Sequence, residues 1–433
     1  MLKAGFSRLD VTPPFGTDIA GYFRRRIADG ILDPLYVNAV AVGNDTDTLV
    51  LMAVDYIGIA YKYNDEIRNY ISEKLGLPVN NIILAALHQH TSPCVSDPVP
   101  PFSALDPVFF DVFKRKCCDA AKMAVDDMSE ATLGTASAET DEPIAFVRRY
   151  FLDNGTVETN PNRDQCPHIT SRCTEADNTV RLLRFSREGK NDIAVVAFST
   201  HPDVIGGTKF SADWCGFVRT YVEEFIDGVS CAFFTGTQGD SNHLDFLKPR
   251  EERGRGYEHS KFMGRTVANT VKKLWDKVDK VNSDAISAKY DVIYTLTNTE
   301  GIEHYDDCLR YQKDRDNGVT DPTNPIQSSG LAARIVALRT APVFHPIPLT
   351  VFGIGNVLFV GFGGEPFTEY GNAVRKLAGD RFAICAVCAN GYEGYFPTAK
   401  AFAEGGYEVE FSPFTKTVEE ELLTALDGMI NKQ

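Results

Sequence analysis

The stretch Asn81-Ile-Ile-Leu-Ala-Ala-Leu-His88-Gln-His90-Thr-Ser-Pro93 joins a continuous apolar run to two histidines. Such a run is typical of a strand buried on both faces of a sheet. Ligand sites in α/β proteins lie in crevices at the C-terminal ends of strands. If the alternation of the strand continues, both imidazoles point to one side. His-x-His commonly offers two nitrogens to a metal, but alone it is also found as ordinary core or surface histidine.

The rest of the chain alternates short apolar runs with helical patterns. Besides 82–86, we predict strands at 38–42, 48–54, 180–185, 194–199, 231–235, 349–354, 357–362 and 382–389. We predict helices at 63–75, 106–127, 215–226, 257–278, 366–377 and 417–431. With no linker or repeat between them, these elements indicate a single large mixed α/β domain over residues 1–433. We expect stacked β-sheets flanked by helices in αββα-like layers, and we expect the more polar, less regular segment 288–346 to be an insertion or a cap.

The charge of the chain excludes some classes of function. It has 433 residues, with 44 Lys and Arg against 59 Asp and Glu, and a formal net charge of −15. Such a surface repels phosphate backbones, so no nucleic-acid partner is expected. The apolar stretch 349–364 is interrupted by Asn356 and several glycines, so we expect no transmembrane segment. No apolar signal-peptide segment is visible after Met1, which predicts a cytoplasmic protein.

Ten cysteines are scattered along the chain. Cys385 and Cys388 have the C-x-x-C spacing of redox or metal sites, but they lie in the apolar run 382–389. Cysteine is among the residues most often buried, and thiols of a non-exported protein stay reduced. We therefore expect structural, unpaired cysteines.

Four other predicted strands also end in polar residues. His201 follows 194–199, the Gly-rich loop 236–243 follows 231–235, and Glu365 and Tyr395 follow the two strands nearest the C-terminus. Each has an ordinary alternative: turn residues for the loop, helix N-terminal electrostatics for Glu365, and a packed aromatic ring for Tyr395. Their shared position at strand ends nevertheless favours a common site.

The order of these motifs resembles the neutral/alkaline non-lysosomal ceramidase family, in its catalytic N-terminal domain. His88-Gln-His90-Thr-Ser-Pro93 is similar to the family's His-Thr-His-Ser-Gly-Pro, and Ser199-Thr-His201-Pro202 to its Ala-Thr-His-Pro. The other matching segments are Ala4-Gly-Phe-Ser-Arg-Leu-Asp10-Val-Thr-Pro13-Pro14, Asp33-Pro34-Leu35-Tyr36, Gly239-Asp240, Gly364-Glu365, Tyr395-x-x-Thr398 and Gly406-Tyr407-Glu408. Together they span nearly the whole chain, which looks like a divergent bacterial-type member.

The resemblance implies a zinc-dependent amidase with a mixed α/β domain. Carried over to this sequence, the Zn²⁺ ligands are His88, His201, Glu365 and Tyr395. His90 and Tyr407 are expected to line the site, together with an arginine at Arg148, although Arg149 is an equally possible register. A zinc ion with an open position polarises a carbonyl and lowers the pKa of its water to about 7. His90 is then expected to move the proton, and Tyr407 or the arginine to stabilise the oxyanion.

The sequence departs from the family at the nucleophile loop. Ceramidases carry Gly-Asp-x-Ser-Pro-Asn, whereas here Asp240 is followed by Ser241, Asn242 and His243. The serine stands one place early, so its hydroxyl is expected to point elsewhere. We therefore predict attack by zinc-bound water, with Ser241 reached only through a rearrangement. Asp240 and Asn242 remain candidate site residues, with Asn242 orienting the substrate.

The expected substrate is a small molecule or a lipid-like amide or ester, and not necessarily ceramide. Two alternatives stay open: a metal-dependent enzyme acting on a carbohydrate or phosphorylated metabolite, and a non-catalytic binding relative. Asp213 has two readings as well, as a carboxylate that orients an imidazole or as the N-cap of the helix 215–226.

Overall fold

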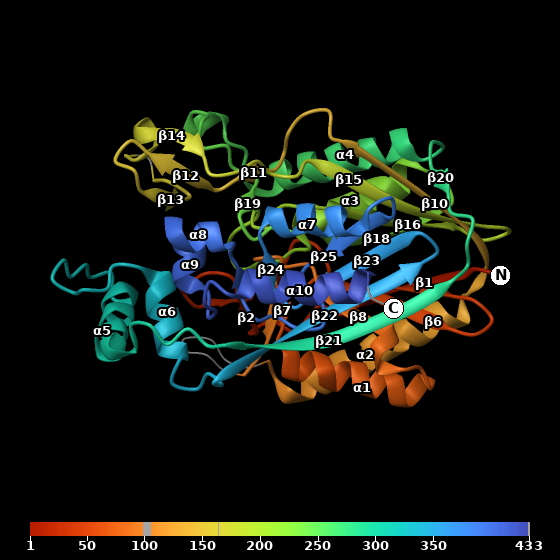
Figure 1. Ribbon diagram of the computed structural model, residues 1–433, viewed down its shortest axis with the longest axis horizontal. Helices are drawn as coiled ribbons and strands as arrows, with labels where there is room; N and C mark the ends of the chain where they lie inside the picture. The colour runs from red at the N-terminus through yellow and green to blue at the C-terminus, as the bar shows by residue number, and fades with distance from the viewer. Residues whose placement is uncertain (98–104, 163, 432–433) are drawn as a thin grey trace.

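Two β-sheets form the centre of the protein, whose computed structural model describes residues 1–97, 105–162 and 164–431 (Figure 1). The larger sheet has the strand order β18-β16-β15-β10-β1-β5-β6-β8, with β20 added beside β10. These strands are β1 (Lys3–Asp10), β5 (Tyr36–Gly43), β6 (Thr48–Val54), β8 (Ile82–Ala86), β10 (Ser129–Glu139), β15 (Thr179–Arg187), β16 (Asp192–Phe198), β18 (Val229–Thr235) and β20 (Asp279–Lys280). Its two outermost pairs, β6 with β8 and β16 with β18, are parallel.

The smaller sheet has the order β21-β22-β23-β25. Its strands are β21 (Ile286–Leu296), β22 (Phe344–Ile354), β23 (Val357–Phe362) and β25 (Phe382–Ala386), and β23 and β25 are parallel. It stacks on the larger sheet, with the rings of Phe234 and Phe359 in edge contact at 4.9 Å between centroids.

The chain after β25 connects the two sheets. The amide of Val387 donates to the carbonyl of Thr235 (2.9 Å), and the amide of Ala86 donates to the carbonyl of Cys388 (3.1 Å). The C-terminal ends of β8, β18 and β25 therefore meet, which brings the polar residues that follow these strands into one region.

Helices cover the outer sides of both sheets. Helices α1 (Tyr61–Leu75) and α2 (Pro107–Asp126) pack on the β5, β6 and β8 side, and α3 (Asp213–Phe225) and α4 (Gly256–Leu274) pack on the β15, β16 and β18 side. Helices α7 (Thr368–Ala378) and α10 (Val418–Asn431) cover the smaller sheet. Figure 1 shows α3 and α4 along the top and α1 and α2 along the bottom. The predicted α/β class with stacked, helix-flanked sheets is confirmed.

The predicted helices and strands recur with end points shifted by a few residues, while strands without an apolar run were not predicted. β1 and β10 alternate small and polar residues. The segment 288–346 is more regular than expected: β21 pairs with β22 along its full length, and α5 (Tyr305–Asp316) and α6 (Ser329–Ala337) follow. β21 is an edge strand with alternating exposure, so its sequence has a polar character.

Short elements complete the fold. They are β2 (Asp18–Ile19), β3 (Arg26–Ile27), β4 (Gly30–Ile31), β7 (Gly58–Ile59), β9 (Cys94–Val95), β11 (Phe146–Val147), β12 (Arg149–Leu152), β13 (Val157–Thr159), β14 (Ile169–Arg172), β17 (Lys209–Phe210), β19 (Ser241–Asn242), β24 (Glu365–Pro366), β26 (Tyr395–Phe396), α8 (Ala399–Glu404), α9 (Tyr407–Phe411) and four 3-10 turns, η1 (Val79–Asn81), η2 (Cys166–His168), η3 (Arg250–Glu252) and η4 (Ile302–His304). The ten cysteines are unpaired thiols, and Cys385 and Cys388 are buried. No helix within residues 1–97, 105–162 and 164–431 has both the length and the apolar character to cross a bilayer.

Candidate metal centre

Three imidazoles and one carboxylate converge where the strand ends meet. Nε2 of His88 and Nε2 of His201 each lie 3.1 Å from the same oxygen, Oε2 of Glu365. Nε2 of His90 lies 3.4 Å from Nε2 of His88. One ring nitrogen from each histidine lies within 4.8 Å of the other two. Residues that are up to 277 positions apart, 88 and 365, therefore share one buried cluster.

Backbone carbonyls determine which imidazole nitrogen carries the hydrogen. Nδ1 of His88 lies 2.8 Å from the carbonyl oxygen of Ile57, and Nδ1 of His201 lies 2.9 Å from those of Gln238 and Ser241. A carbonyl oxygen only accepts, so Nδ1 is the protonated nitrogen in both rings. In the neutral ring, the lone pair of Nε2 then faces Glu365, which is the usual arrangement of a metal-binding histidine.

Burial disfavours the protonated form of two of the imidazoles, His90 and His201. Burial, reinforced by the nearby charge of Arg148, lowers the pKa of His201, and burial lowers the pKa of His90 well below its usual value. Burial alone would raise the pKa of Glu365, but the adjacent His88 and His201 hold it well below its usual value. The ionised carboxylate of Glu365 therefore faces Nε2 of both His88 and His201, and a cation bound among these three groups would neutralise its charge.

The donor set fits a zinc ion. Neighbouring ligands of a tetrahedral zinc lie about 3.3 Å apart, from metal–ligand lengths of about 2.0–2.1 Å, and the separations here are 3.1–3.4 Å. Oε1 of Glu365 and Nδ1 of His90 are buried and have no hydrogen-bond partner in the described part of the chain. His90 approaches the cluster as closely as the expected ligands do, so the geometry does not set it apart from them.

The backbone reaches this geometry by a turn and not by strand alternation. β8 ends at Ala86, and His88 adopts φ +74°, the left-handed region that non-glycine residues rarely occupy. The amide of His88 donates to the carbonyl of Tyr56 (2.9 Å), and the amide of His90 donates to the carbonyl of Pro202 (3.0 Å). His88 and His90 do point to a common centre, as expected, but strand alternation is not the cause, because the ladder has already ended at Ala86. Such strain is found at functional sites.

A short parallel pair of strands brings Glu365 and Tyr395 together. β24 and β26 pair in register Glu365 to Tyr395. The Tyr395 ring lies 6.3 Å from the His201 ring and 5.8 Å from the Tyr407 ring, between centroids. Burial, and after it the charge of Glu365, raises the pKa of Tyr395 well above its usual value, so its phenol is neutral in the absence of a cation.

Arg148 and Arg149 point to different surroundings. The Arg148 guanidinium carbon lies 5.4 Å from the Tyr395 ring centroid and 6.0 Å from that of Tyr407. Its Nε pairs with Glu408 at 2.8 Å, and its Nη2 donates to the carbonyl of Gly239 at 2.8 Å. Arg149 instead bonds to Glu404 and lies over Phe367. Of the two candidate arginines, Arg148 is therefore the one that lies beside Tyr395 and Tyr407.

The loop after β18 supports the cluster through its backbone. Oδ1 of Asp240 accepts from the amide and the hydroxyl of Thr368, both at 2.8 Å, at the start of α7. The Ser241 hydroxyl is buried against the carbonyls of Ser199 (3.5 Å) and Gln238 (3.4 Å). Asn242 donates to Asn160 at 2.7 Å. These three side chains hold the loop, whose carbonyls in turn orient His201.

Several residues near the centre carry no motif of their own in the sequence. Gln238 donates to Oε2 of Glu365 at 3.3 Å, and the Tyr22 ring lies edge-on to His90 at 5.5 Å. Glu408 is fully buried between Arg148 and Arg149. Glu408 could have been found from the sequence, because it directly follows Tyr407 in Gly406-Tyr407-Glu408, a segment that resembles the ceramidase family.

Asp213 fits neither of its two expected roles. Its Oδ2 accepts from the amides of Val204 and Ile205, both at 3.0 Å, and it lies within α3 at φ +48°. Burial raises its pKa to about 6. It contacts no imidazole of the centre, and it instead holds the turn that follows His201.

Comparison with solved structures shows that this chain has a ceramidase-like fold. The crystal structure of neutral ceramidase from Pseudomonas aeruginosa superposes with a TM-score of 0.72 at 16% identity, covering 99% of this chain and 74% of that chain. A structure of ceramidase complexed with C2 gives a TM-score of 0.74 at 15% identity, with the same coverage. No protein-family model matches the sequence, and no curated protein is similar to it at the sequence level.

Proposed function

We propose that this chain is a zinc-dependent hydrolase of amide or ester bonds, with residues 1–433 as one catalytic domain. The observation that carries the proposal is the convergence of Nε2 of His88 and Nε2 of His201 on one ionised carboxylate oxygen of Glu365, each at 3.1 Å. The ceramidase-like fold supports the same reaction class. Zinc, when bound, supplies Lewis acidity toward a carbonyl and makes a neighbouring water acidic.

The residues around the cluster suit amide cleavage. His88, His201 and Glu365 hold the cation, and Tyr395 is the fourth ligand. His90 moves a proton at Nε2, which faces the cluster. Arg148 and Tyr407 donate to the oxyanion that develops at the substrate carbonyl, and each such donor contributes about 2.7–4 kcal/mol.

Water is the proposed nucleophile, in preference to Ser241. The contacts of the Ser241 hydroxyl with the carbonyls of Ser199 and Gln238 support this choice, because a hydroxyl held by carbonyl oxygens has no base to activate it.

We further propose that the segment between β21 and β22, which contains α5 and α6, caps the site. Arg334 of α6 donates to the carbonyl of Glu410 in α9 at 2.9 Å, and Ser328 bonds to the Glu410 carboxylate. A Cβ at Gly330 would lie 3.0 Å from the Tyr407 ring, so α6 lies directly on the helix that carries Tyr407.

Metal content and turnover test the proposal together. We expect one zinc per chain by elemental analysis of the purified protein, and hydrolysis of at least one member of an acyl-amide panel that stops on chelation and returns with zinc. His201→Ala removes both properties. His168→Ala, an exposed histidine paired with Asp153 at 2.9 Å, is the matched control and retains both. Undiminished hydrolysis by metal-free protein would contradict the proposal.

A further inference from the structure

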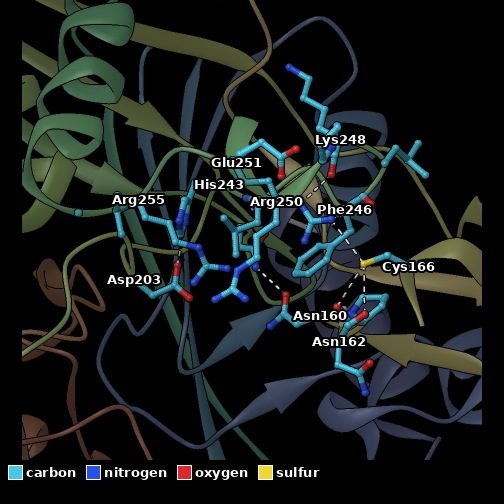
Figure 2. A pocket seen from close by; sticks show the side chains of 18 of the residues that line it. Asn160, Asn162, Cys166, Asp203, His243, Phe246, Lys248, Arg250, Glu251 and Arg255 are labelled. Carbon is cyan, nitrogen blue, oxygen red and sulfur yellow. Dashed lines mark hydrogen bonds and ion pairs between the residues drawn. The ribbon is translucent and has the colours of Figure 1, made fainter. Parts of the chain in front are cut away.

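A large cavity with basic walls lies beside the metal centre. It encloses about 1260 Å³, and we call it the arginine cavity after Arg250 and Arg255, which line it with Asn160, Asp203 and His243 (Figure 2). The described protein surface is acidic on balance, since the chain carries a formal net charge of −15. A basic cavity on such a chain calls for a specific explanation.

The arginine cavity shares its wall with the metal centre. Tyr22 lines the cavity and makes edge contact with the His90 ring. Asn242, another lining residue, follows Ser241, whose carbonyl accepts from Nδ1 of His201. A molecule bound in the cavity therefore lies next to the reacting groups of the proposed hydrolase.

Two guanidinium groups line the cavity without a carboxylate partner among the described residues. Figure 2 shows the side chains of Arg250 and Arg255 extending into it. Neither forms an ion pair with a carboxylate of residues 1–97, 105–162 or 164–431. Arg253 differs, because it donates to the carbonyls of Lys248 and Phe246. Both side chains are exposed, so their N–H groups are free to bind an anion that enters the cavity.

The acids on the wall do not supply this anion. Asp203 contacts Nδ1 of His243 at 3.2 Å and forms no ion pair with either arginine in the described chain. Glu251 also lines the cavity, where it is exposed like Arg250 and Arg255, and it forms no ion pair with either arginine in the described chain. Lys248, a further cation of the wall, balances the charge of Glu251.

His243 gives an independent indication of a ligand. Its side chain is 3% exposed, and its Nδ1 is taken by Asp203. Its Nε2 is buried without a hydrogen-bond partner in the described chain, although the residue lines the cavity. Such an atom costs free energy unless a ligand or water satisfies it. It stands on the same wall as the two guanidinium groups.

We infer that the arginine cavity binds an oxyanion of the substrate, a carboxylate or a phosphate, through Arg250 and Arg255. The substrate class is then an anionic amide, and the inference rests on the proposed function. Guanidinium groups match the geometry of both anions, since each offers two parallel N–H donors. Specificity arises because a neutral amide leaves the two cations unpaired.

Three amides with the same butanoyl group test the inference: N-butanoylglycine, neutral N-butanoylethanolamine, and the phosphate monoester of the latter. We expect kcat/KM of the zinc-loaded protein to be at least tenfold higher for one or both anions than for the neutral amide. The double variant Arg250→Ala/Arg255→Ala should reduce that ratio at least tenfold, since hydrogen bonds to charged groups are strong. The double variant Arg250→Lys/Arg255→Lys should retain part of the preference for the anionic amides, because it keeps both positive charges.

The control removes two arginines elsewhere. Arg115→Ala/Arg310→Ala deletes exposed, ion-paired guanidinium groups on α2 and α5, and it should keep the wild-type preference. Amide cleavage with equal kcat/KM for the neutral and anionic members would overturn the anion site and leave the hydrolase standing.

A binding measurement separates the inference from the proposed function. If none of the three amides is cleaved, the hydrolase assignment fails for this class, and the cavity is judged by calorimetric titration with inorganic phosphate. Binding that weakens at least tenfold in Arg250→Ala/Arg255→Ala supports the anion site. Equal phosphate affinity in the wild type and the double variant, or no detectable phosphate binding by either protein, would overturn the anion site.

Discussion

At the scale of single residues, the centre depends on how closely the chain passes the imidazoles. Gly21 is one such position, with φ +102°, and a Cβ there would lie 2.6 Å from Nδ1 of His90. His88 itself occupies the left-handed region. The positions of the ring nitrogens therefore depend on backbone conformations that most residue types rarely adopt.

Gly21→Ala tests this dependence. The new methyl group must displace the His90 ring, the proposed proton-transfer group, so we expect turnover to fall at least tenfold, with a stability loss of about 1–3 kcal/mol from the positive φ and the clash. Gly207→Ala is the matched control, because its φ is +94° and nothing lies within 4 Å of its Cβ position. Urea unfolding measures the stability, and hydrolysis of the acyl-amide panel measures the turnover. Equal turnover by the two variants would mean that only the backbone strain matters.

At the scale of elements, the strand ends matter more than the strands. β24 and β26 are two residues long, yet they align Glu365 with Tyr395. The loop 236–243 lies against them, and the amide of Gly239 donates to the carbonyl of Pro366 at 2.9 Å. These short contacts position the carboxylate against the imidazoles.

Gly239→Ala should therefore disturb the centre from outside it. A Cβ at this position would lie 2.4 Å from the carbonyl oxygen of Glu365. We expect at least tenfold weaker zinc binding, together with a destabilisation of about 1–3 kcal/mol from overpacking. Gly206→Ala serves as the control, since its Cβ position is open and its φ is not positive. Unchanged zinc affinity in Gly239→Ala, measured by competition with a chelator, would refute this account of the loop.

At the scale of the whole molecule, the cluster exists only because two sheets stack. His88 and His201 follow strands of the larger sheet, whereas Glu365 follows β23 of the smaller one. The contact of Phe234 with Phe359 lies in the core between them. The histidine–glutamate cluster therefore depends on the interface between the two sheets.

Phe359→Ala should lower both stability and zinc affinity. Phe359 is fully buried, and such truncations cost about 3–5 kcal/mol through lost burial and the cavity left behind. Phe344→Ala on β22 is the control, because that ring is 53% exposed, and its effect should stay within about 0.5 kcal/mol. Thermal unfolding with and without zinc tests the coupling, and a zinc-induced rise in Tm as large in Phe359→Ala as in the wild type would contradict it.

The apolar strands, the main helices and the polar residues after five strand ends could be predicted from the sequence, because burial on both faces and helical periodicity leave local patterns. It also placed His88, His201 and Glu365 among the candidates. It did not reveal β1, β10 or β21, whose alternating or small residues acquire meaning only beside their neighbours in a sheet.

Only the tertiary structure decided that His88 turns through a left-handed conformation, that Arg148 and not Arg149 faces the tyrosines, and that Asp240, Ser241 and Asn242 hold a loop. It also gathered Arg250, Arg255 and His243 on one wall. The physical reason is that side-chain direction and charge balance depend on residues far away in the chain, which stacking of the two sheets brings within a few ångströms.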